Sequence, residues 1–194
     1  GAAGGAGGAG GGRVAPLSRL LVPTGGGGMA GCCCLERDAY LPISPRTRIS
    51  PVGGCCLARD AASPQTQVWA IEPEGYDDHR TSLARGERTP LSGTPATTIC
   101  DALQANAPGH VTFAINSGGL AGAAAVGDAD VIEAMRVAFE TLKLVLEPSG
   151  ALGLAALLSG QVPLRDGEGV AVVACGGNVA LPDFLGLVQR ERTQ

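Results

Sequence analysis

The residues best suited to chemistry lie between 20 and 31. An apolar run at 20–22 predicts a strand, four consecutive glycines at 25–28 follow it, and Met29 opens a predicted helix. Consecutive glycines let the backbone turn sharply and bring several N–H groups to one point. A helix start adds unpaired N–H groups and the positive end of its dipole. The arrangement predicts a phosphate-binding corner, with a flexible linker as the alternative.

A group of carboxylates follows the next predicted strand, at 68–71. Four of them fall within residues 72–78. Ligand sites in open α/β sheets gather at the carboxyl ends of strands. Glu72 and Asp78, with a backbone carbonyl nearby, are therefore candidates to hold a hard cation such as Mg²⁺ or Ca²⁺ through oxygen. The alternative is an acidic, solvated turn before a helix predicted at 77–84.

The seven cysteines predict no metal site of their own. None is spaced as C-x-x-C, and only His79 and His110 could join them, which argues against zinc. Neighbouring cysteines on a helix are more often small buried hydrophobic residues in a reducing compartment. We therefore expect a cytoplasmic location.

Composition favours one α/β core. The chain has 194 residues, 45% of them hydrophobic but only 3% aromatic, so valine, leucine, isoleucine and alanine must build the core. Such a core is typical of an open, mostly parallel sheet with helices on both faces, in three layers. The net charge of −4 and the lack of a basic block argue against nucleic acid or an anionic membrane as partner. No apolar stretch is long enough to span a bilayer, and we see no secretory signal.

The organisation of the chain follows from its composition. Residues 1–12 are only glycine and alanine, so we expect 1–18 to be a disordered tail and lead-in, followed by one domain at 19–190. Asp128 is a suitable N-cap for an amphipathic helix whose apolar stripe is Ile132, Met135, Phe139, Leu142 and Leu146. The remaining predicted elements are strands at 111–115, 123–126 and 170–175, a short helical piece at 99–103, and helices at 151–158 and 182–189.

An internal repeat occupies about 31–68. Residues 31–39 and 53–61 are identical at seven of nine positions, at an offset of 22. Two copies of a helix-turn-strand unit are too few for a solenoid. We interpret the repeat as a local duplication whose first copy is extruded as a loop; the alternative is that both copies pack in tandem.

Five blocks in this order resemble the pyridoxal-phosphate-dependent serine/threonine dehydratases of fold type II, the group that includes serine racemase. The similarity covers roughly residues 19–190. The matching blocks are Val22-Pro23-Thr24-Gly25-Gly26-Gly27-Gly28-Met29-Ala30-Gly31, Ile71-Glu72-Pro73-Glu74-Gly75-Tyr76-Asp77-Asp78, Thr98-Ile99-Cys100-Asp101, Leu146-Glu147-Pro148-Ser149-Gly150 and Cys175-Gly176-Gly177-Asn178.

The resemblance implies roles for particular residues. The cofactor is pyridoxal 5′-phosphate, and Cys175 would face its pyridine nitrogen while Glu147 would lie close to its ring. Glu72, the carbonyl of Tyr76 and Asp78 match the divalent-cation site of some relatives. The residues that would bind the 5′-phosphate through backbone N–H groups, or lie beside it, are Gly25, Gly26, Gly27, Gly28 and Met29.

One departure from the family is decisive for activity. Relatives bind the cofactor covalently through a lysine in a Ser-x-Lys-x-Arg-Gly type motif upstream of the glycines, whereas this chain has a single lysine, Lys143, on the predicted amphipathic helix. We therefore expect the C-terminal part of the large domain of a dehydratase of L-serine or L-threonine, inactive alone. The alternatives are a non-catalytic module that binds the cofactor or phosphate, or pairs as a homodimer or with a complementing chain, and a chain without function.

Overall fold

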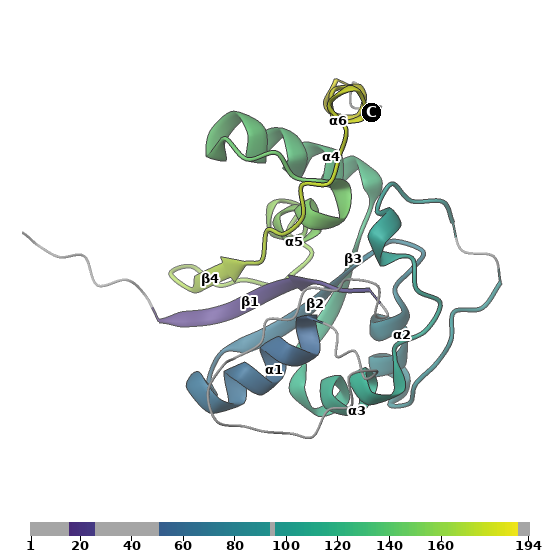
Figure 1. The fold of residues 1–194 in the computed structure, drawn as a ribbon. Coiled ribbons are helices and arrows are strands. Elements are labelled where there is room, and N and C mark those ends of the chain that lie inside the picture. Colours follow the sequence, from purple (N-terminus) through teal and green to yellow (C-terminus); the bar gives the residue numbers. More distant parts are fainter. Residues whose placement is uncertain (1–15, 26–50, 94–95, 190–194) are drawn as a thin grey trace, which may run out of the picture.

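The computed structural model describes residues 16–25, 51–93 and 96–189. Four strands and their flanking helices make up this part of the chain (Figure 1). The elements are β1 (Leu17–Pro23), α1 (Pro51–Ala62), β2 (Gln67–Pro73), α2 (Asp78–Arg85), η1 (Asp101–Leu103), α3 (His110–Gly119), β3 (Gly122–Val126), α4 (Asp128–Val137), η2 (Ala138–Leu142), α5 (Pro148–Leu158), β4 (Gly169–Val172) and α6 (Leu181–Val188).

The four strands form one parallel sheet in the order β3-β2-β1-β4. Leu21 in the middle of β1 pairs with Trp69 of β2 on one side and with Val172 of β4 on the other. In a parallel sheet all carboxyl ends lie along the same edge, so the segments that follow β1, β2 and β4 emerge side by side. The predicted α/β class with an open parallel sheet is confirmed.

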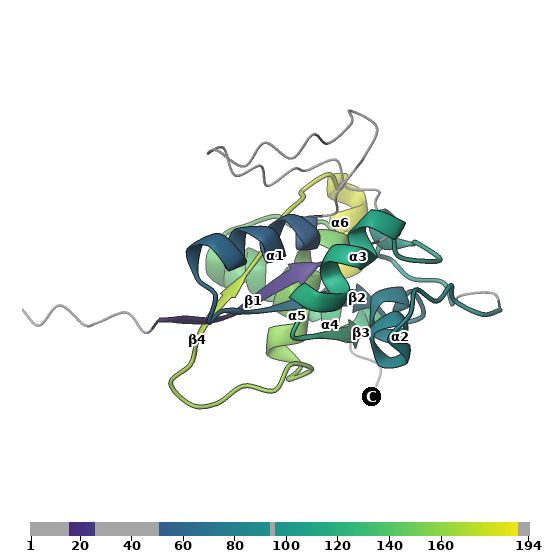
Figure 2. The ribbon, with the colours of Figure 1, turned by 90° about the horizontal axis from the view of Figure 1, so that it is seen from below.

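Successive side chains of each strand enter different cores, because neighbours on a strand point to opposite faces. Leu21 and Ile71 belong to the larger core, under α4, α5 and α6. Val22 and Ala70 belong to the smaller core, under α1. Figures 1 and 2 show the same division, with α1 and α3 on one face of the sheet and α4, α5 and α6 on the other. The chain therefore has the three layers expected from its composition.

Small residues let α5 lie directly against the sheet. A Cβ atom on Gly153 would come within 3.0 Å of a Val172 methyl group. Ala151, Leu152 and Ala155 of the same helix are fully buried. This close packing places the N-terminus of α5 next to the carboxyl ends of β1 and β4.

Several predicted elements are confirmed with small shifts of their ends. The strands expected at 20–22, 68–71 and 123–126 are β1, β2 and β3. The helices expected at 77–84 and 182–189 are α2 and α6. The second copy of the repeat forms α1, a turn and then β2, which is the helix-turn-strand unit that was expected. No helix in the described ranges is both long and apolar enough to cross a membrane.

The strand predicted at 111–115 is wrong, because this segment is the start of α3. The apolar run Val111-Thr112-Phe113 suggested a strand, but only Thr112 and Phe113 of these three are buried, as on one face of a helix. Helix α3 packs against α1, where Arg59 donates a hydrogen bond to the carbonyl of Gly119. Packing against a second helix decides the conformation here, not the local preference for strand.

Two predictions about the amphipathic helix also need correction. Asp128 is the first residue of α4 and does not cap it; its carboxylate accepts hydrogen bonds from Thr98 and Ile99 instead. The helix also stops before Leu146, because a π-helical turn ends at Lys143 in the left-handed conformation, with φ of 60°. Phe139 and Leu142 of the expected apolar stripe are consequently 47% and 52% exposed.

Some predictions concern residues outside the described ranges. These are residues 1–15 of the tail and lead-in expected at 1–18, the glycines and methionine at 26–29, and the first copy of the repeat at 31–39. They stay predictions.

The end of the lead-in was wrong, because β1 already begins at Leu17. The helix expected at 151–158, α5, starts earlier, at Pro148, with Glu147 as its N-cap residue.

Candidate functional site

The first part of the site lies where β1 ends. The N–H of Thr24 donates a 2.7 Å hydrogen bond to the carbonyl of Ile71, so β1 stays paired with β2 up to the start of the glycine run. Gly25 lies against η1, since a Cβ atom there would come within 2.9 Å of the Cα atom of Leu103. Only glycine allows this approach of two backbones.

Side-chain hydrogen bonds hold η1 in this position. Thr98 donates a 2.6 Å hydrogen bond to the carboxylate of Asp128, which ties the segment before η1 to the start of α4. On the other side, the N–H of Ala102 donates to the hydroxyl of Ser149 in the first turn of α5. The block at 98–101 is thus fixed between α4 and α5, next to the end of β1.

The segment after β4 crosses the N-terminus of α5. A Cβ atom on Gly150 would lie 1.7 Å from the carbonyl oxygen of Cys175, so this position has no room for any side chain. The N–H of Glu147 donates to the carbonyl of Gly176, and the Glu147 carboxylate accepts a hydrogen bond from the N–H of Asn178. Glu147 therefore holds the Gly-Gly turn in place.

Four of the five sequence blocks that carry the resemblance therefore converge at one edge of the sheet. Glu147 and the half-buried Cys175 meet at the N-terminus of α5, and Gly25 is linked to the same helix end through η1. Lys143 lies outside this group of contacts: it is exposed, and its ammonium donates a hydrogen bond to the carbonyl of Glu140.

The fifth block forms a buried polar cluster at the end of β2. Glu72, Asp78 and His79 are all fully buried. The Glu72 carboxylate accepts hydrogen bonds of 2.8 and 2.9 Å from the N–H groups of His79 and Arg80. Since the first N–H groups of a helix have no partner within it, Glu72 acts as the cap of α2.

His79 brings a nitrogen atom into this cluster. Its Nδ1 atom lies 3.1 Å from Oε1 of Glu72 and 3.6 Å from Oδ2 of Asp78. Neither Asp78 oxygen has a donor within hydrogen-bonding reach among the described residues, so Asp78 and Glu72 can hydrogen-bond to each other only if one of the two carboxyl groups holds a proton. Sequence reasoning named Glu72 and Asp78 but considered His79 only as a partner for the cysteines; its place directly after Asp78, at a helix start, was the available signal.

Burial controls the ionisation of the three groups. It raises the pKa of Glu72 and of Asp78 to about 7 each, and at Asp78 the charge of Glu72 adds to the rise. Burial lowers the pKa of His79, opposed by the charge of Asp78. Once both carboxyl groups have lost their protons, the cluster would hold two carboxylates beside a neutral imidazole. Such a donor set suits a divalent cation.

The other residues of the block lie around the cluster. The N–H of Tyr76 donates to the carbonyl of Pro73 in the turn that follows β2. Asp77 forms an ion pair with Arg80 on the outside of α2. Among the described residues, Glu72, Asp78 and His79 are the one group of histidine, cysteine and carboxylate side chains close enough to share a metal ion.

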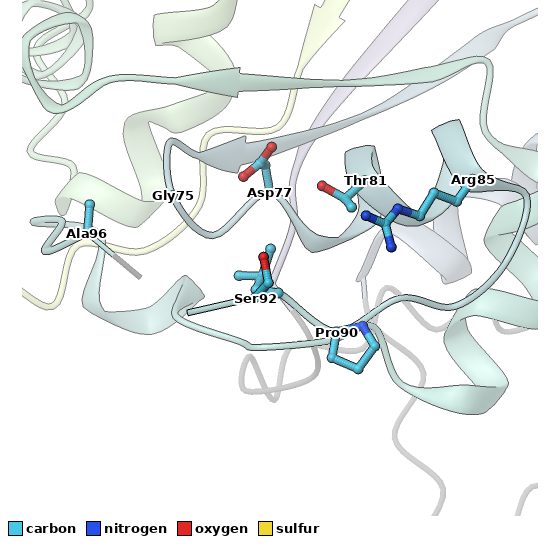
Figure 3. A pocket seen from close by; sticks show the side chains of 8 residues that line it. Gly75, Asp77, Thr81, Arg85, Pro90, Ser92 and Ala96 are labelled. Carbon is cyan, nitrogen blue, oxygen red and sulfur yellow. The ribbon is translucent and has the colours of Figure 1, made fainter. Parts of the chain in front are cut away.

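A pocket of about 340 Å³ lies along the outer side of α2. Figure 3 shows Asp77, Thr81 and Arg85 of this segment on one side, with Pro90 and Ser92 of the following loop opposite them. None of the residues that line it belongs to the buried cluster or to the converging segments. It is therefore a separate feature.

Comparison with known sequences defines the class of protein. The family described as "Pyridoxal-phosphate dependent enzyme" matches residues 13–176. The chain therefore belongs to the pyridoxal-phosphate-dependent enzymes, as its sequence blocks predicted.

The relatives that the chain matches within this family are enzymes named as ammonia-lyases and serine racemases. The chain is 33% identical to an L-threo-3-hydroxyaspartate ammonia-lyase of Pseudomonas sp over 174 residues, which are 90% of this chain and 47% of that protein. It is 31% identical to a serine racemase of Arabidopsis thaliana, over 87% of this chain and 45% of that protein. The chain spans about half the length of these relatives.

Solved structures agree on the fold. A threonine deaminase from T.th. matches with a TM-score of 0.67 and 31% identity, over 84% of this chain and 51% of that one. A maize serine racemase matches with a TM-score of 0.68 and 29% identity, over 88% and 45% of the two chains. The architecture is that of fold type II.

Among the described residues, Cys175 fits the family's cofactor. Cys175 offers a thiol, which can donate or accept a hydrogen bond, at the carboxyl end of β4. A thiol at this position could face a pyridine nitrogen without adding a charge. At Gly25 and Gly150 the space that a side chain would take is filled by Leu103 and by the backbone of Cys175, so these glycines bring neighbouring segments together at this edge of the sheet.

Proposed function

We propose that this chain is the cofactor-holding part of a pyridoxal-phosphate-dependent lyase of the serine/threonine dehydratase type. Such an enzyme converts L-serine or L-threonine to a 2-oxo acid and ammonia. The observation that supports the proposal most is the convergence of Gly25, Glu147 and Cys175 at one edge of the sheet. Pyridoxal phosphate, when bound, withdraws electrons from the substrate's Cα atom and makes its proton acidic.

Each group of residues would have a separate task. The backbone N–H groups of Gly25, Gly26, Gly27 and Gly28, with Met29 beside them, would hold the 5′-phosphate at the end of β1. Cys175 would face the pyridine nitrogen as a neutral partner, which favours elimination over transamination because it does not keep that nitrogen protonated. Glu147 would lie near the ring while it holds the Gly-Gly turn.

The proposal includes the absence of activity in this chain alone. Its one lysine, Lys143, is exposed, and its ammonium donates a hydrogen bond to the carbonyl of Glu140. Covalent attachment of the cofactor needs an amine at the site. A lysine from elsewhere would therefore have to complete the enzyme, and the substrate class rests on the names of the relatives, which are ammonia-lyases, racemases and a deaminase.

A cation site belongs to the same proposal. Glu72, the carbonyl of Tyr76 and Asp78 would bind a divalent ion such as Mg²⁺ or Ca²⁺. The support is that the Asp78 carboxylate is fully buried with no donor for either oxygen in the described part of the chain. A buried charge of this kind is costly unless an ion or a proton compensates it.

The binding claim can be tested without catalysis. Pyridoxine 5′-phosphate carries the ring and phosphate but no aldehyde, so it cannot react with an amine. We expect it to quench the fluorescence of Trp69, the only tryptophan, in a saturable way that inorganic phosphate reverses, whereas pyridoxine without phosphate should have little effect. Lys143→Ala should leave this titration unchanged. Equal binding of pyridoxine and its phosphate would contradict the proposal.

The second candidate is a non-catalytic module that associates with a longer relative. Large apolar side chains are exposed on η2, in the segment after it and on α6, namely Phe139, Leu142, Leu144, Val145, Leu181 and Leu185. Relatives are about twice as long, and the additional half would be the occupant of this face. Light scattering of the chain mixed with a full-length relative distinguishes the two: a stable complex that forms without cofactor favours the module.

A further inference from the structure

The cation site that we propose above has a nitrogen donor as well as oxygen donors. We propose that His79 is a direct ligand of that site, and that the site therefore prefers a first-row transition-metal ion, such as Mn²⁺, over Mg²⁺ or Ca²⁺. This inference rests on the proposed cation site and adds the identity of the ligand and the class of ion.

The distances allow one ion to contact all three side chains. Two ligands bound to the same ion at about 2.1 Å lie roughly 3 to 4 Å from each other. Nδ1 of His79 lies 3.1 Å from Glu72 Oε1 and 3.6 Å from Asp78 Oδ2, and one donor atom from each of the three residues falls within 4.8 Å of the others. No backbone movement is needed to bring them onto one ion.

The hydrogen bonds leave capacity for an ion. Both Asp78 oxygens are buried and lack partners among the described residues. Nδ1 of His79, the nitrogen that faces the two carboxylates, has Glu72 Oε1 as its neighbour at 3.1 Å, where an ion could take the place of a hydrogen-bonding proton. Buried polar atoms in native proteins are nearly always satisfied. Glu72 is already bound by two N–H groups of α2, but a carboxylate has further lone pairs that can face a metal.

No side-chain cation in the described part of the chain compensates the cluster. Arg80, the basic residue next to His79, pairs with Asp77 on the outside of α2 and is largely exposed. Its backbone N–H, and not its guanidinium, contacts Glu72. The compensating positive charge must then come from a bound ion or from a proton shared by Glu72 and Asp78.

The imidazole nitrogen decides between classes of ion. Mg²⁺ and Ca²⁺ prefer oxygen ligands, whereas imidazole is a ligand of first-row transition-metal ions, of which Mn²⁺ binds it most weakly. A buried neutral histidine next to two carboxylates therefore raises affinity for Mn²⁺ more than for Mg²⁺. Mn²⁺ is also the best probe, because thiolates select softer ions and the seven cysteines will compete less for it.

The experiment starts from the full chain freed of metal with EDTA. Mn²⁺ is titrated in and followed by the loss of the free-ion electron paramagnetic resonance signal, with Mg²⁺ and Ca²⁺ as competitors. We expect one site that binds Mn²⁺ about tenfold more tightly than Mg²⁺. His79→Gln should lose most of that preference, and Asp78→Asn should lose binding of both ions. His110→Gln, at the exposed second histidine, is the matched control and should behave like the parent chain.

A spectroscopic readout tests ligation without changing the site. Electron spin-echo modulation of bound Mn²⁺ should show coupling to a nitrogen nucleus. In the His110→Gln chain labelled with ¹⁵N-histidine, the coupling should change from ¹⁴N to ¹⁵N, because His79 is then the only histidine left. This arm remains valid if His79→Gln does not fold.

Each outcome has a consequence. Saturable Mn²⁺ binding without histidine coupling would overturn the role of His79 but leave an oxygen-only cation site. No saturable binding of any of the three ions would overturn the site itself and favour a shared proton. Neither result bears on the pyridoxine 5′-phosphate titration, so the two proposals fail independently.

Discussion

Replacing Asp78 by asparagine should stabilise the metal-free chain, and more so at high pH. In the folded chain, burial and then the charge of Glu72 raise the pKa of Asp78 from its ordinary 3.8 to about 7. When folding raises the pKa of a carboxyl group, the folded state is least destabilised at a pH below the pKa of the unfolded state, where the group is protonated in both states. The free energy of unfolding then falls as the pH rises toward the pKa of the folded state. Asp78 therefore costs nothing below about pH 4 and most above about pH 7.

The magnitude follows from the shift. One pKa unit corresponds to about 1.4 kcal/mol, so a rise of about three units amounts to about 4 kcal/mol at pH 8 and about 1.5 kcal/mol at pH 5. Part of the shift comes from the charge of Glu72, which itself varies with pH, so these values are upper limits. We expect the gain in unfolding free energy from Asp78→Asn to increase by about 2 kcal/mol between the two pH values.

Urea unfolding in EDTA at pH 5 and pH 8 measures this difference. The lowered pKa of His79 acts in the opposite direction, since it removes stability as pH falls below its ordinary 6.5, but it acts on both chains and largely cancels. Asp60→Asn is the control, because this carboxylate is exposed and should change stability by less than about 0.5 kcal/mol at either pH. An Asp78→Asn gain that is the same at both pH values would refute the reasoning.

Three further predictions concern packing and access. Gly150→Ala should destabilise the chain by about 3 kcal/mol or more in urea unfolding, because the added methyl group would meet a backbone carbonyl. Gly186→Ala, with open space around it, is the control and should stabilise α6 by about 0.5 kcal/mol. Similar effects of the two substitutions would contradict the contact at Gly150. Phe184→Ala should cost about 3 to 5 kcal/mol in the same assay, because this ring is almost fully buried; a loss below about 1 kcal/mol would mean that α6 is not docked. In native alkylation followed by mass spectrometry, Cys175 should react faster than Cys100, because burial raises the pKa of the Cys100 thiol to about 12. Pyridoxine 5′-phosphate should protect Cys175 alone from alkylation. Protection of neither thiol would contradict a place for Cys175 beside the pyridine ring.

The sequence predicted those parts of the fold that local patterns determine. Strands β1 and β2 are apolar runs, and the breaks at glycine and proline placed their ends within a few residues. Helix α3 was missed because its β-branched residues favour a strand locally, and only its packing on α1 makes it helical. The end of α4 was missed because the apolar spacing continues past Leu142 while the backbone turns at Lys143.

The candidate site was predicted only in part for a similar reason. Glu72 and Asp78 stand close together at the end of a predicted strand, so the sequence could indicate them. His79 and the capping role of Glu72 depend on where α2 begins in space. The contact of Gly150 with Cys175 joins residues 25 apart in the chain, and nothing in the local sequence of either one requires it.

The central claim is that this chain can hold the coenzyme but has no amine where catalysis needs one. The most direct measurement is ammonia release from L-serine and L-threonine by the purified chain in excess pyridoxal phosphate. The account predicts a rate equal to that of free pyridoxal phosphate, for the parent chain and for Lys143→Ala alike. Sustained turnover above that background would contradict it, and loss of that turnover in Lys143→Ala would identify the amine responsible.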